Sequence, residues 1–112
     1  MSLKDYVFGF NAESKAVRYL EKNGFKILER NFHSRFGEID IIATKGQNLH
    51  FIEVKATNGD YEAISRVTSK KMAKLIKTIN FYLLQSQFNL NYQLDLICVQ
   101  KDTITMLENI SI

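Results

Sequence analysis

Two short apolar segments of this chain carry charged residues at alternate positions, and this pattern constrains the fold most. The segments are residues 37–43 and 51–55, and their charged side chains are Glu38, Asp40, Glu53 and Lys55. Successive side chains of a strand point to opposite faces, so each segment, read as a strand, places its charges on one face. Charge in a buried strand is costly unless a partner compensates it. The pattern therefore predicts a sheet that carries a metal- and phosphate-binding site.

The short polar connection between these segments sets the expected pairing. If Gly46 comes first in a two-residue type II′ turn, the numbers of paired residues sum to 93. Asp40 then lies opposite Glu53, and Glu38 lies opposite Lys55, with Cβ atoms about 4.5–5.5 Å apart. Two carboxylates about 4 Å apart repel by about 4 kcal/mol at an effective dielectric constant near 20, so Mg²⁺ is expected between them. The alternative is a ladder of ordinary ion pairs on a solvated hairpin face.

Periodicity along the rest of the chain predicts an α/β fold with one mixed sheet flanked by helices. The expected order is α-β-β-β-α-β-β. The helices are expected at residues 11–23 and Ser69–Ser86, and the strands at residues 25–29, 36–44, 49–56, 92–100 and Thr103–Leu107. The second helix should bury an apolar stripe made of Met72, Leu75, Ile76, Ile79 and Leu83. In the fourth strand, Asp95 should anchor a core hydrogen bond and Cys98 should be a buried thiol.

Composition limits the class of protein. A chain of 112 residues without linker or repeat predicts a single domain over residues 1–112. Its apolar runs are too short to cross a bilayer, and no signal-peptide pattern opens it. With one cysteine there is no internal disulfide, so a cytoplasmic protein without a membrane partner is expected. The net charge of +3 permits a polyanionic partner.

The first helix adds another acid to the pattern. Glu13 shares a helical face with Ala16, Val17 and Leu20, where an apolar residue would be expected. If this face packs on the sheet near the hairpin, Glu13 joins the acids of the site. The alternative is a first-turn acid that is favoured by the helix dipole.

The second helix is basic. Residues 63–94 contain no Asp or Glu, and Arg66, Lys70, Lys74 and Lys77 share one helical face if the helix reaches back to Arg66. Lysines on such a face bind nucleic-acid phosphates in a salt-sensitive and sequence-independent way. A solvated basic face is the alternative.

Glu13, the Gly-Glu-Ile-Asp motif at residues 37–40 and the Glu-Val-Lys motif at residues 53–55 together resemble the PD-(D/E)xK nuclease superfamily, with Ile39 in place of the proline. Within it, most of the chain resembles the YraN family, small bacterial proteins related to archaeal Holliday-junction resolvases. The resemblance implies a restriction-endonuclease-like core. It makes Asp40 and Glu53 ligands of Mg²⁺ or Mn²⁺, Lys55 the catalytic lysine, Glu13 a helix acid that assists metal or water positioning, and Glu38 an additional acid.

Three hypotheses follow for the function. The first is a metal-dependent endonuclease that acts on DNA, including branched or structured DNA. The second is a non-catalytic nucleic-acid-binding module in a DNA-processing complex, and the third is a dimerisation domain whose strand charges are ordinary ion pairs. The resemblance to resolvases also suggests a homodimer, because two sites would be needed to cut two strands.

Overall fold

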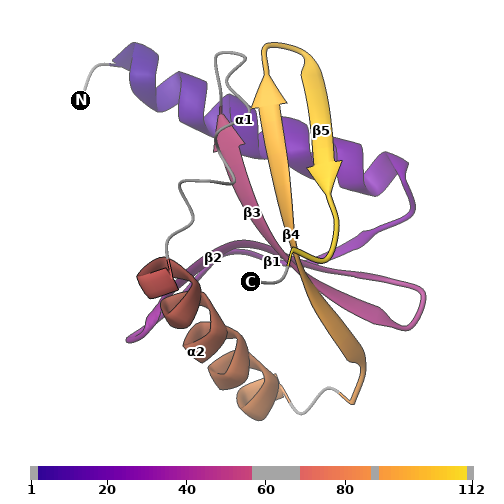
Figure 1. Cartoon of the computed structure of the whole chain (residues 1–112). Coiled ribbons are helices and arrows are strands. Elements are labelled where there is room, and N and C mark those ends of the chain that lie inside the picture. Colours follow the sequence, from indigo (N-terminus) through magenta and orange to yellow (C-terminus); the bar gives the residue numbers. More distant parts are fainter. Residues whose placement is uncertain (1–2, 57–68, 87–88, 111–112) are drawn as a thin grey trace.

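The computed structural model describes residues 3–56, 69–86 and 89–110 (Figure 1). In chain order the elements are α1 (Leu3–Lys22), β1 (Lys26–Ser34), β2 (Gly37–Lys45), β3 (Asn48–Ala56), α2 (Ser69–Ser86), β4 (Asn91–Gln100) and β5 (Thr103–Leu107). The strands form one sheet in the order β1-β2-β3-β4-β5, in which β3 and β4 are parallel and the other neighbours are antiparallel. This confirms the predicted α/β class and element order, although α1 and β1 are longer than expected. Neither described helix is both long and apolar enough to span a membrane.

The two helices cover opposite faces of the sheet (Figure 1). In β3, Ile52 packs in a cluster with Leu20 of α1, whereas its neighbour Phe51 packs in a cluster with Leu75 of α2. Adjacent strand residues point to opposite faces, so β3 is buried on both sides. Helix α2 lies in the connection between the parallel strands β3 and β4, which cannot be joined by a tight turn.

The buried side of α2 differs in part from the predicted stripe. Most of the predicted residues are buried or partly buried, but Ile76 is 49% exposed, so its assignment to the stripe is wrong. Tyr82 and Thr78 are buried instead. The Thr78 hydroxyl donates to the carbonyl oxygen of Lys74 at 2.9 Å, which satisfies a polar group that the stripe pattern did not include. The helix is therefore rotated away from Ile76 and toward Thr78 and Tyr82.

The hairpin has the predicted register. Ile41 pairs with Ile52 and Lys45 with Asn48, and Gly46 has the positive φ of +61° that the first central residue of a type II′ turn requires. The ladder ends at the Ile41–Ile52 pair, because β2 diverges from β3 beyond this point. The predicted ladder pairs Asp40–Glu53 and Glu38–Lys55 are therefore wrong, and Glu38 pairs with His33 of β1 instead.

Strand β2 is irregular at Asp40. Ile39 and Ile42 pack in the cluster of α2, whereas Ile41 packs in the cluster of α1, so the usual alternation of faces breaks between residues 39 and 41. On the neighbouring strand, Asn31 has a φ of +52°, in the left-handed region. Such irregularities in a ladder change the direction in which a side chain points. The distortion places Asp40 where β2 separates from β3.

Strand β4 carries two predicted buried residues. The side chain of Asp95 is 0% exposed and accepts hydrogen bonds from the Asn109 N–H and from Gln93 Nε2, both at 2.8 Å. Its other oxygen lies 2.6 Å from His50 Nδ1. Cys98 is a buried free thiol. Both predictions are confirmed, and His50 has a structural place beside Asp95.

Candidate metal and phosphate site

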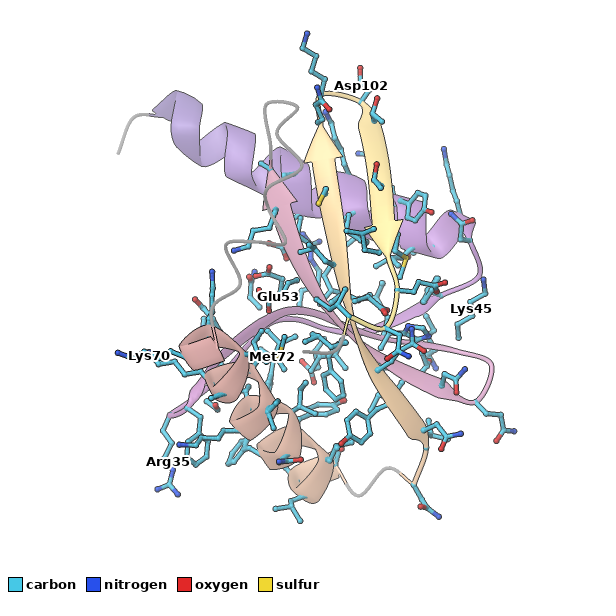
Figure 2. All side chains as sticks on the ribbon, in the orientation of Figure 1. Arg35, Lys45, Glu53, Lys70, Met72 and Asp102 are labelled. Atoms are coloured by element: carbon cyan, nitrogen blue, oxygen red, sulfur yellow. The ribbon has the colours of Figure 1, made fainter. Side chains whose placement is uncertain are left out.

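Residues from β2, β3 and the first turns of α2 line one cavity of about 650 Å³. Figure 2 shows Glu53 on β3, near the end of α2 from which Lys70 extends. The lining consists of Gly37, Glu38, Asp40, Glu53, Val54, Lys55, Lys70, Lys71, Lys74 and Leu75. An acidic pocket beside a basic helix, as the charge pattern predicted, is thus present in the described part of the chain.

Asp40 and Glu53 form an acid pair at this cavity. The Val54 N–H donates to Asp40 Oδ2 at 2.8 Å, which fixes the Asp40 carboxyl group against the backbone of β3. The carboxyl groups of Asp40 and Glu53 also hydrogen-bond each other, which requires a proton on one of them. Glu53 Oε1 is buried and has no hydrogen-bond partner among the described residues. The predicted convergence of these two side chains is therefore present, with one oxygen left for a ligand.

Burial governs the ionisation of the acid pair. Loss of solvent raises the pKa of Glu53 to about 8, and the negative charge of Asp40 adds to this rise, while Lys55 opposes it. Burial also raises the pKa of Asp40, against the lowering effects of the Val54 N–H, the Glu53 side chain and Lys55. The two carboxyl groups therefore titrate as a coupled pair, and burial favours the protonated form of Glu53 at neutral pH.

Two lysines face the acid pair, and sequence reasoning identified only one of them. Lys55 acts on both carboxyl groups through its positive charge. Lys71 of α2 contacts Lys55, and this contact is the largest cause of a lowered pKa for Lys71. The sequence did contain a signal, because Lys71 lies four residues before the buried Leu75 and hence on the sheet-facing side of the helix.

The other two predicted acids lie at the edge of this arrangement. Glu13 Oε1 accepts a hydrogen bond from Arg30 Nε at 3.1 Å, and the charge of Glu13 still raises the pKa of Asp40. The Glu38 side chain is 65% exposed and lies 3.1 Å from His33 Nδ1. Glu13 is therefore near the acid pair but engaged by an arginine, and Glu38 lies at the open mouth of the cavity.

The predicted basic face is described only in part. Lys70 and Lys74 are exposed and line the cavity, and Lys77 is exposed further along α2. Arg66 lies outside the described residues. The lysines of α2 therefore extend from the acid pair along one side of the molecule.

The donor set at the acid pair fits a hard divalent cation. Both side chains offer carboxylate oxygens, and within the described part of the chain the buried Glu53 Oε1 lacks the hydrogen-bond partner that a buried polar atom normally has. Across residues 3–56, 69–86 and 89–110, no three His, Cys, Asp or Glu side chains gather as a metal site. Mg²⁺ commonly binds through one or two carboxylates and keeps several waters, so two acids are enough for it.

Comparison with known proteins gives a family but no activity. A family model described as "Uncharacterised protein family UPF0102" matches residues 12–99. The UPF0102 protein of Campylobacter fetus subsp. fetus is 57% identical over 111 residues, covering 99% of both chains. The UPF0102 protein of Campylobacter hominis is 54% identical over 112 residues, covering 100% of both chains. The matched region includes both acids of the pair and the two lysines that face them.

Proposed function

The chain belongs to the UPF0102 family, as the YraN-like resemblance predicted, and from its site we propose that it is a divalent-metal-dependent phosphodiesterase that cleaves DNA. The observation that carries this proposal is the acid pair itself. Two carboxyl groups meet at a cavity and hydrogen-bond each other, and one buried Glu53 oxygen has no partner among the residues that the structure describes. Such an arrangement is unfavourable in the absence of a bound cation and favourable with one.

The residues present have separable roles in phosphodiester hydrolysis. Asp40 and Glu53 would hold Mg²⁺ or Mn²⁺, and the bound ion would supply a Lewis acid and lower the pKa of a water molecule. Lys55 would bind a nonbridging phosphate oxygen and stabilise the negative charge that develops when water attacks phosphorus and the P–O bond to the sugar breaks. Glu13, whose charge acts on Asp40, would assist in positioning the metal or the water.

The surroundings of the cavity support a polymeric phosphate substrate. Lys70 and Lys74 line it, and Lys77 continues the positive charge along α2. Lysines bind the backbone without reading sequence, so the enzyme should recognise the shape of the DNA. The resemblance to Holliday-junction resolvases and to the PD-(D/E)xK superfamily favours branched DNA and a homodimer with two sites.

The direct test is cleavage of a DNA panel by the purified protein in Mg²⁺ or Mn²⁺. The panel contains labelled single-stranded DNA, duplex DNA and a four-way junction. We expect cleavage, fastest on the junction, that falls about 100-fold or more in Asp40→Asn and Lys55→Ala. The matched control is Asp102→Asn, because the side chain of Asp102 is 96% exposed and pairs with the exposed Lys15.

Two results would reject the proposal. One is the absence of cleavage of every substrate with either metal. The other is cleavage by Asp40→Asn and Lys55→Ala at the wild-type rate, which would show that another protein or another site is responsible.

A non-catalytic nucleic-acid-binding module is the second candidate. It is favoured by the Arg30–Glu13 contact, which engages a further acid, so that Asp40 and Glu53 are the acid pair offered to a cation within the described residues. This alternative predicts salt-dependent DNA binding without turnover in any metal. The same DNA panel distinguishes it from the nuclease.

A further inference from the structure

Aromatic side chains gather where the turn between β1 and β2 meets the outer side of α2. The ring centroid of Phe81 on α2 lies 6.2 Å from that of Phe36 in the turn and 6.2 Å from that of Phe32 on β1. Phe32 packs against the core cluster of α2. Phe81 is 36% exposed, and Phe36 is partly exposed. Two of the three rings therefore reach the surface, where adjoining apolar groups mark an interaction site.

The turn that carries Phe36 is held by a hydroxyl group and covered by an arginine. Ser34 Oγ accepts a hydrogen bond from the Phe36 N–H and donates to the Gly37 carbonyl oxygen, both at 3.1 Å. The Arg35 guanidinium carbon lies 4.8 Å from the centroid of the Phe36 ring, within the range of a cation–π contact. Arg35 is exposed and extends outward on the same side of the molecule as Lys70 (Figure 2). The turn therefore presents a planar cation and an aromatic ring together.

The basic side of α2 leads to these rings. Lys70, Lys74, Lys77 and Phe81 follow one another at spacings of four, three and four residues, which places them along one side of the helix. A Cβ atom on Gly37, the residue after Phe36, would lie 3.9 Å from Lys74 Cβ, and both Gly37 and Lys74 line the cavity of the acid pair. The aromatic surface is therefore continuous with the cavity and with the lysines of α2.

The charge of this surface selects its occupant. Arg35, Lys74 and Lys77 are exposed, and the sequence of α2 contains no acid to offset them. A second copy of the chain, bound through the same surface about a two-fold axis, would place these cations opposite one another. A nucleic acid instead offers phosphates to the lysines and the flat faces of its bases to the rings and the guanidinium group. Bases inside a duplex are already stacked, so an unpaired base fits this surface best.

We propose that Arg35, Phe36 and Phe81 form a stacking platform for an unpaired base of a DNA strand whose phosphates lie along the lysines of α2. The base stacks against the Phe81 ring and the Arg35 guanidinium group, and Phe36, which contacts both, holds them together. The platform rests on the proposed function for its ligand, nucleic acid, but it requires neither metal nor cleavage. It deepens that function, because it makes an unpaired base beside the acid pair the feature that the protein recognises.

The test compares two probes that carry the same phosphates but differ in their bases. Binding of a fluorescein-labelled oligothymidylate and of an abasic oligomer of equal length is measured by fluorescence anisotropy, in EDTA and over a NaCl series. We expect the wild type to bind the oligothymidylate about fivefold or more tightly than the abasic oligomer, since stacking on an aromatic ring stabilises a bound base. The salt slopes should be equal, because the phosphate contacts are the same.

Substitutions separate stacking from packing and from charge. Phe81→Leu keeps an apolar side chain but removes the aromatic face, so it should lose most of the preference for the oligothymidylate, and Phe81→Tyr should retain it. Arg35→Lys keeps the charge but loses the guanidinium plane, so it should lower the affinity for the oligothymidylate alone. The matched control is Tyr92→Leu. Tyr92 is an aromatic residue of β4 that is 52% exposed and contacts Phe51, so its loss should leave the preference unchanged.

The outcomes separate the platform from the nuclease. Equal affinity of the wild type for the two oligomers, no binding of either, or an unchanged preference in Phe81→Leu would each overturn the platform. If Phe81→Leu instead abolished self-association in sedimentation velocity and kept the preference, the surface would belong to a second copy. Base-dependent binding in EDTA without cleavage in Mg²⁺ or Mn²⁺ would support the platform and reject the nuclease. Cleavage without any base preference would do the reverse.

Discussion

Glu53 combines three properties that rarely occur together in a surface acid. It is half-buried, its carboxyl group is paired with a second acid, and one of its oxygens has no hydrogen-bond partner among the described residues. The sequence predicted that Asp40 and Glu53 meet, but from a regular ladder, whereas the pairing ends at Ile41–Ile52 and the alternation of faces breaks at Asp40. It did not predict Lys71 beside Lys55, since the rotation of α2 depends on packing that helical periodicity leaves open.

The ionisation of Glu53 makes stability depend on pH. Its pKa rises from 4.5 to about 8 on folding, so between these values the native state binds more protons than the unfolded state. The free energy of unfolding should therefore fall as the pH rises through this window, by on the order of a few kcal/mol. Glu53→Gln should flatten this dependence and be the more stable protein at pH 8. Urea unfolding without metal at pH 5 to 9 measures it, and an unchanged pH profile in the variant would contradict the assigned cause.

Removal of the buried acid Asp95 should destabilise the fold. Its carboxylate is fully buried, accepts from Gln93 and Asn109 and contacts His50, so Asp95→Ala removes a partner of the buried His50 and of the partly buried Gln93. We expect a loss of about 2–4 kcal/mol in the free energy of unfolding. Asp102→Ala, which removes an exposed partner of Lys15, should cost less than about 1 kcal/mol. Similar losses in the two variants, measured by urea unfolding, would show that the buried network contributes little.

At the element scale, the site depends on the close approach of α2 to the start of β2. Gly37 has a φ of +151°, and a Cβ atom there would lie 3.2 Å from Thr78 Oγ1 and 3.9 Å from Lys74 Cβ. The glycine therefore permits the packing that brings the lysines of α2 to the acid pair. Sequence periodicity predicted both elements and their order but not this contact, because it depends on how a helix and a strand cross.

Gly37→Ala should separate α2 from β2. We expect a loss of about 1–3 kcal/mol in the free energy of unfolding, from backbone strain and the crowded Cβ. The matched control is Gly46→Ala. Gly46 has a φ of +61° but no atom within 4 Å of the added Cβ, so this variant should show the cost of backbone strain without crowding. The Gly37 variant should in addition bind DNA more weakly, since Lys71 is displaced. Equal DNA affinity in both variants would contradict this.

At the scale of the whole molecule, charge is segregated around one cavity. The acid pair comes from the strands and most of the facing lysines come from α2, although the net charge is only +3. The charge pattern of the sequence predicted this separation, because the acids and the lysines fall in different parts of the chain. The break of alternation at Asp40 was not predictable, since it follows from the distortion opposite Asn31 in a neighbouring strand.

Binding of DNA should follow the position of the lysines and not the total charge. The triple variant Lys70→Gln, Lys74→Gln, Lys77→Gln should weaken junction binding strongly and lower the salt slope by about 2–3. Lys22→Gln, Lys26→Gln, Lys45→Gln changes the net charge equally at exposed positions away from the cavity and should have a small effect. Fluorescence anisotropy over a NaCl series measures both. Equal losses of DNA affinity in the two triple variants would show that binding depends on net charge and not on the basic face of α2.

The proposed hydrolysis requires a divalent cation at the acid pair. Isothermal titration calorimetry with Mn²⁺ at pH 7, in two buffers of different ionisation enthalpy, reports uptake of the ion and release of protons together. We expect one ion per chain, with release of about one proton as the shared proton of Asp40 and Glu53 leaves. Uptake should be lost in Asp40→Asn and Glu53→Gln and retained in Asp102→Asn. No uptake by the wild type, or equal uptake by all three variants, would contradict the central claim.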